Sequence, residues 1–145
     1  MSNYRILFLA LGLLFICPNC SLQPTEVTRE QARQLVLAVL QSQGFDVKSP
    51  NLVVEDWPDA PDIPGFYLLG AHTIAPDMNL SAGSFAVGRR TAEVWNWTHC
   101  WRFSRAKNVR NLQKKLRKEI GVTDSEYQKL AAKRPFCFSI PFVEK

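Results

Sequence analysis

Residues 84–98, SFAVGRRTAEVWNWT, contain the segment that decides the fold. Residues 84–88 and 93–98 are two apolar arms, and Arg-Arg-Thr-Ala at 89–92 separates them. Two such arms joined by a short turn are typical of an antiparallel hairpin. Trp95 and Trp97 alternate onto one face of the second arm, where they either cover the core or form an exposed aromatic strip for carbohydrate or protein binding. We expect them in the core, because a small domain uses large aromatic side chains to make up for limited volume.

The segment before the hairpin predicts a helix, a loop and a further strand. Residues 28–31, Thr-Arg-Glu-Gln, form a capping box, and apolar residues follow at helical spacing until Gly44. The apolar side of this helix is wide, so we expect it to be buried against a sheet. Residues 55–65 are rich in proline and acid and predict an exposed loop, whereas residues 66–73 predict a strand.

A basic amphipathic helix is predicted after the hairpin. We expect it to begin at Ser104 or Asn108 and to end at Gly121, with an apolar stripe formed by Val109, Leu112, Leu116 and Ile120. A second capping box at residues 123–126 predicts a short helix that ends before Pro135. The fold class is therefore α+β, with an N-terminal helix packed on a small antiparallel sheet, followed by two C-terminal helices.

Charge divides the chain into an acidic and a basic part. Residues 21–88 hold eight acidic and three basic residues, a net charge of −5, whereas residues 89–145 hold five acidic and fourteen basic residues, a net charge of +9. This polarity should steer anionic partners toward one side of the molecule. The side chains that we expect to form the contact surface are Arg102, Arg105, Arg110, Lys114, Arg117 and Lys118. A solvated outer helix face explains the same pattern, so the surface is a hypothesis.

The chemistry of this basic surface favours an acidic protein or an anionic envelope polymer as the partner. Nucleic acid is a poor fit as a partner, because the apolar N-terminal residues 1–20 predict export, which would separate the protein from cellular DNA and RNA. In addition, no RNP, KH or helix-turn-helix signature accompanies the charge. A helix lying on a membrane surface is also disfavoured, since the apolar stripe is narrow and lacks aromatic residues.

The N-terminal residues 1–20 predict a signal peptide, and residues 21–145 predict a single domain. Arg5 precedes an unbroken apolar run at residues 6–16, which is too short to span a membrane. The protein is therefore expected to be exported to the periplasm or cell envelope. Plain signal cleavage and lipid attachment at Cys20 or Cys17 both stay open, and a lipid anchor would be the link to the membrane.

Removal of the signal leaves two cysteines, Cys100 and Cys137. In an oxidising compartment we expect them to form one disulfide, which would stabilise the fold by about 3–4 kcal/mol. A reactive thiol beside His99 is disfavoured, because adjacent residues on a strand point to opposite faces.

Enzyme motifs are missing from the sequence. His72 and His99 fall into no metal-binding spacing, and no nucleophile motif such as GxSxG is present. The carboxylates of residues 55–62 are interleaved with proline and lack the apolar surroundings that raise a carboxyl pKa. We therefore expect a protein without catalysis, metal or cofactor. A small envelope hydrolase that uses His72 with a carboxylate and a structural lipoprotein are the alternatives.

Residues 85–95, FAVGRRTAEVW, resemble the strand-turn-strand of PepSY-like and related cystatin-like small exported bacterial domains, where a residue pair before Thr-Gly-Glu-Val makes the turn. The upstream helix that begins at Thr28 is also similar to that group, and Ala92 stands where glycine is usual. The resemblance implies a non-catalytic binding or inhibitory role and carries no functional residue across.

Overall fold

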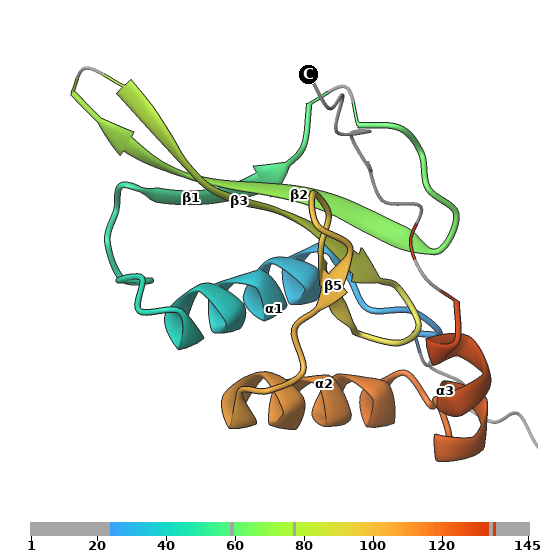
Figure 1. Ribbon diagram of the computed structural model, residues 1–145. Helices are drawn as coiled ribbons and strands as arrows, with labels where there is room; N and C mark the ends of the chain where they lie inside the picture. Colours follow the sequence, from blue (N-terminus) through green and yellow to red (C-terminus); the bar gives the residue numbers. More distant parts are fainter. Residues whose placement is uncertain (1–23, 59, 77, 134, 136–145) are drawn as a thin grey trace, which may run out of the picture.

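The computed structural model describes residues 24–58, 60–76, 78–133 and 135, and its elements follow the predicted order of helix, sheet and two helices (Figure 1). The strands form one antiparallel sheet in the order β1-β2-β3-β4-β5. The α+β prediction is thus confirmed. The elements are α1 (Arg29–Ser42), β1 (Leu52–Asp56), β2 (Phe66–Ala75), β3 (Met78–Gly88), β4 (Val94–Asn96), β5 (Trp101–Arg102), α2 (Lys107–Glu119) and α3 (Asp124–Ala131).

The first helix, α1, lies between the sheet and α2 (Figure 1). Its N-terminus is closed by the predicted capping box, in which Thr28 Oγ1 accepts from Gln31 N and Gln31 Oε1 accepts from Thr28 N. Contact with the sheet on one side and with α2 on another explains why its apolar side is wide. Its fully buried residues are Ala32, Leu35, Val36, Val39 and Leu40.

The two faces of the sheet carry two separate apolar clusters. On the face toward α1, Leu69 and Phe85 belong to the main core. On the other face, Trp95 and Trp97 are 6% and 3% exposed and pack with Leu68. The expectation that these tryptophans are buried is confirmed. They are covered by side chains from the proline-rich loop rather than by a helix, because strand alternation directs them away from α1.

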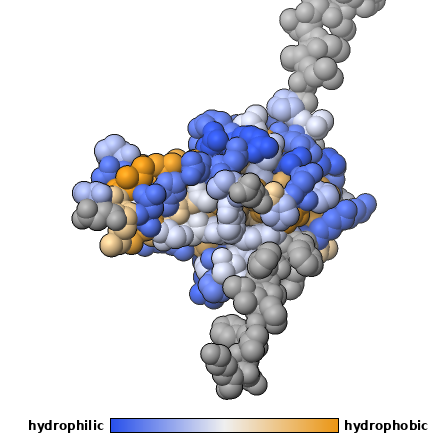
Figure 2. Space-filling model, turned by 90° about the horizontal axis from the view of Figure 1, so that it is seen from above, coloured by the Kyte–Doolittle hydropathy of each residue, from blue (hydrophilic) through white to orange (hydrophobic). Residues whose placement is uncertain are grey.

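The β2–β3 hairpin is longer than the sequence predicts. The second strand continues to Ala75, and β3 begins at Met78 rather than near Ser84. Residues 79–83 contain asparagine, serine and glycine, which give little strand signal alone, but pairing with β2 satisfies their backbone. The hairpin extends past α1 (Figure 1), and Figure 2 shows apolar colour at this end of the molecule. The exposed apolar side chains there are Ile74, Met78 and Leu80.

The turn at residues 89–92 joins β3 to β4 and directs Glu93 into the protein. Gly88 N donates to Glu93 O at 2.9 Å, and Ala92 N donates to Gly88 O at 2.9 Å. Ala92 has a φ of 55°, in the left-handed region. The backbone at Ala92 therefore has the conformation that glycine adopts more readily than alanine.

Several predictions concern residues that the structure does not describe. The expected signal peptide at 1–20, with Cys17 and Cys20, lies outside the described residues, as does Cys137. Within the described ranges, no helix has the length and apolar character needed to cross a membrane.

Candidate functional site

A polar stripe on α2 forms one wall of the candidate site. Arg110, Gln113, Lys114 and Arg117 follow the i, i+3, i+4, i+7 spacing that places side chains on one face of a helix. This stripe lies beside the apolar one, of which Val109 and Leu116 are buried. The helix begins after Ala106, whose side chain makes no capping hydrogen bond. Its last turn carries Arg117 and Lys118, and positive charge is favourable at the C-terminus of a helix.

A buried carboxylate, Glu93, lies opposite this stripe. Its side chain is 3% exposed, and Oε1 accepts from Arg102 Nη1 at 2.5 Å and from the Tyr127 hydroxyl at 2.8 Å. Three separate segments thus meet at one carboxylate: the turn before β4, strand β5 and helix α3. Burial raises the pKa of Tyr127 above its ordinary value of 10.0, and the hydrogen bond to Glu93 raises it further.

A pocket of about 210 Å³ lies where these elements meet, and we call it the basic pocket. Glu93 is its acidic group and Gln113 its buried amide. The residues that line it are Glu93, Arg102, Ser104, Arg110, Gln113, Lys114, Arg117 and Tyr127.

Neutral groups hold two of the pocket's guanidinium groups in place. Arg110 Nη1 donates to the carbonyl oxygens of Arg105 at 2.7 Å and Ser104 at 3.2 Å. Arg117 Nη1 donates to the Thr91 carbonyl oxygen at 2.9 Å, and its guanidinium carbon lies 4.0 Å from the centre of the Tyr127 ring. These contacts fix the side chains without cancelling their charge. The basic pocket therefore has a positive potential that Glu93 offsets only in part.

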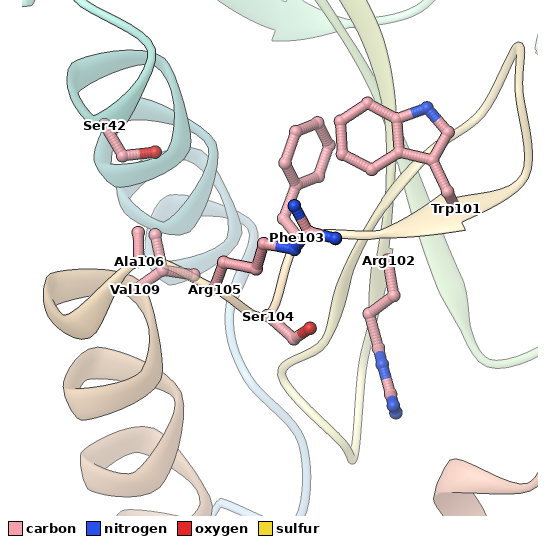
Figure 3. Close-up of a pocket in the computed structure, with 8 residues that line it drawn as sticks. All are labelled: Ser42, Trp101, Arg102, Phe103, Ser104, Arg105, Ala106 and Val109. Atoms are coloured by element: carbon pink, nitrogen blue, oxygen red, sulfur yellow. The ribbon is translucent and has the colours of Figure 1, made fainter.

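A larger, open groove of about 820 Å³ (Figure 3) lies next to the basic pocket, and Arg102 and Ser104 line both. The Trp101 and Phe103 rings lie 4.2 Å apart, centre to centre, and Trp101 is 45% exposed. Figure 3 shows Arg102 pointing away from Trp101, as neighbours on a strand do. The groove therefore offers an aromatic surface beside the charged one.

The structure brings together four of the six predicted contact residues. Arg102, Arg110, Lys114 and Arg117 line the basic pocket. Arg105 lines the neighbouring groove, and Lys118 is exposed on α2 and lines neither. A contact role for these residues stays a prediction.

Sequence reasoning missed four residues of the basic pocket, which are Glu93, Ser104, Gln113 and Tyr127. The only local signal was the helical spacing of Gln113 with Arg110 and Arg117. Glu93 and Tyr127 carry no such signal, since they lie 34 residues apart in the sequence.

The alternative histidine site lies elsewhere, on the sheet face away from α1. His72 Nδ1 is 3.8 Å from Glu55 Oε1, beyond hydrogen-bond distance, and the His72 side chain is 24% exposed. Ser81 is the cross-strand partner of His72 in β3. The described part of the chain holds no group of three or more His, Cys, Asp or Glu side chains able to hold a metal ion.

The predicted disulfide connects Cys100 to a residue outside the described ranges, so the pairing stays a prediction. Cys100 Sγ lies 4.0 Å from the carbonyl oxygen of Pro135, which is two residues before Cys137. The described chain at Pro135 therefore lies close to Cys100.

Comparison with known proteins gives a fold relative. No family model and no curated protein matches the chain, so the resemblance to PepSY-like and cystatin-like domains gains no support. A similar solved structure is a chain from a type VI secretion system effector-immunity complex of Pseudomonas protegens. The TM-score is 0.60 and the identity 24%, and the match covers 74% of this chain and 88% of that chain. At this identity the likeness shows the fold alone.

Proposed function

We propose that this protein is a non-catalytic, inhibitor-like binding protein whose basic pocket and surrounding α2 surface engage an acidic protein partner. The observation that carries the proposal is the convergence of Arg102, Arg110, Lys114 and Arg117 around one pocket. Of these, Arg102 alone is paired with a carboxylate within the described residues. Unneutralised charge at a concave site attracts an oppositely charged partner and orients it during encounter.

The fold relative makes an effector the partner that we favour. It comes from an effector-immunity complex, so a chain of this fold is found in an assembly of two proteins. We further propose that binding occurs in the cell envelope, on the expectation that residues 1–20 direct export. An anionic envelope polymer is the competing partner.

Co-expression with the products of neighbouring genes tests the proposal. We expect one of these products to inhibit growth, this protein to restore growth, and the two to copurify in a complex that weakens as salt rises. Reversing the charge of Lys114, Arg117 and Lys118 together should abolish both protection and copurification. Lys48→Glu, outside the basic helix, is the matched control and should retain both. Unchanged capture by the triple variant would contradict the proposal.

The hydrolase alternative keeps one supporting observation, which is that His72 lies beside the carboxylate of Glu55. This pair is on an open sheet face, where water keeps electrostatic interactions weak. A role as a structural lipoprotein would instead show as lipid attachment without a protein partner.

A further inference from the structure

Gln113, which lines the basic pocket, has a buried side-chain amide donor without a hydrogen-bond partner among the described residues. The residue is 6% exposed, and the donor atom is its Nε2. A buried donor without an acceptor costs free energy, so most such groups in proteins are satisfied. Gln113 lines the basic pocket, so rotation of its side-chain amide toward the pocket would bring Nε2 to an acceptor bound there.

The charges around Gln113 indicate the sign of that acceptor. Arg110, Lys114 and Arg117 form no ion pair with a carboxylate of the described residues. Arg102 is already paired with Glu93. A ligand that accepts a hydrogen bond and carries negative charge matches both the amide and the cations.

The size and composition of the basic pocket favour a small monoanion. Its volume of about 210 Å³ is below the range of roughly 300–1,000 Å³ that is usual for drug-sized ligands. Glu93 lines the same pocket, and its negative charge repels a dianion such as phosphate more strongly than a carboxylate.

We propose that the basic pocket receives one carboxylate, the side chain of an aspartate or glutamate on the protein partner. Gln113 Nε2 donates to it, and Lys114 and Arg110 supply the charge. The inference rests on the proposed function, since it names the group by which the partner is held.

Titration of the free protein with capped glutamate and with acetate tests the pocket directly. We expect the side-chain amide signals of Gln113 to shift saturably in NMR spectra at about millimolar ligand. Lys114→Met should weaken this binding about tenfold, and Lys118→Met should leave it nearly unchanged. The two lysines share the helix and the charge but differ in whether they line the basic pocket.

Three results would overturn the inference. The first is that the NMR signals of the Gln113 side-chain amide show no saturable shift up to about 50 mM carboxylate. The second is that Lys114→Met and Lys118→Met weaken carboxylate binding equally, and the third is that inorganic phosphate binds more than about tenfold tighter than acetate. Gln113→Met gives a second measurement. It should remove carboxylate binding while keeping or raising the unfolding midpoint, because an unsatisfied buried donor is removed. A lowered midpoint would instead show that Gln113 has a structural role.

The titration uses no partner, so its failure is separable from failure of the proposed function. Carboxylate binding by a protein that captures no partner would reject only the proposed function. Partner capture that survives Gln113→Met and Lys114→Met would reject only the carboxylate site.

Discussion

The Glu93–Arg102 pair should respond asymmetrically when either charge is removed. The Glu93 side chain is 3% exposed, whereas that of Arg102 is 41% exposed. Arg102→Met leaves a carboxylate buried without its cation, and removing one partner of a buried pair costs about 3–5 kcal/mol. We expect Arg102→Met to lower the unfolding free energy by about 3 kcal/mol, at the low end of that range, because the Tyr127 hydroxyl still donates to Glu93.

Changing the other partner of the pair, by Glu93→Gln, should lower the unfolding free energy by a smaller amount. A lone Arg102 keeps much of its hydration, and the amide oxygen of glutamine can still accept from Arg102 and Tyr127. The cost is then the difference between a charged and a neutral hydrogen bond, about 1 kcal/mol. The same change removes the negative charge of the basic pocket, so carboxylate affinity should rise while stability falls.

Urea unfolding followed by tryptophan fluorescence measures both losses. If the unfolding free energy depends on urea concentration with the same slope in wild type and variants, the denatured state is unchanged. The urea midpoints then report the difference in stability. Arg105→Met, an exposed arginine in the neighbouring groove, is the control and should change stability by less than about 0.5 kcal/mol. A loss for Glu93→Gln equal to or greater than that for Arg102→Met would refute the reasoning.

Three further predictions concern the basic pocket, the turn and the sheet. The raised pKa of Tyr127 means that the native state keeps a proton that the unfolded chain releases, so stability should fall as pH rises above about 10. In urea unfolding measured between about pH 8 and about pH 11, the unfolding free energy of Tyr127→Phe should fall less than that of the wild type. Gly88→Ala should lower the unfolding free energy by about 1–3 kcal/mol, because the added Cβ would lie 2.1 Å from Thr91 Oγ1. Gly70→Ala, with nothing within 4 Å, is its control, and an equal effect of the two would contradict the packing argument. His72→Ala should leave partner capture intact, whereas loss of a hydrolytic activity by a folded variant would favour the hydrolase alternative.

Local sequence signals were sufficient for the helices and for the fold class. The capping box at Thr28 closes α1 as predicted, and Thr123 caps α3 by accepting from Glu126 N. The order of elements follows from these signals, because helix caps and apolar periodicity depend on residues only a few positions apart.

Signals that depend on a neighbouring strand were not visible in the sequence. The first part of β3, from Met78 to Gly83, becomes a strand through its pairing with β2. Trp95 and Trp97 were expected to be buried, but periodicity does not say which segment covers them. That the proline-rich loop does so depends on the path of residues 60–65 across the sheet.

The sequence alone determined the charge of the basic surface, because the number of arginine and lysine residues in the C-terminal part of the chain can be counted directly. Only the tertiary structure decided which of them meet. Four predicted basic residues line one pocket with Glu93, Gln113 and Tyr127, whereas Lys118 remains outside it on the same helix. The physical reason is that a pocket forms from segments distant in the chain, whose separation is set by packing of the core between them and not by local propensity.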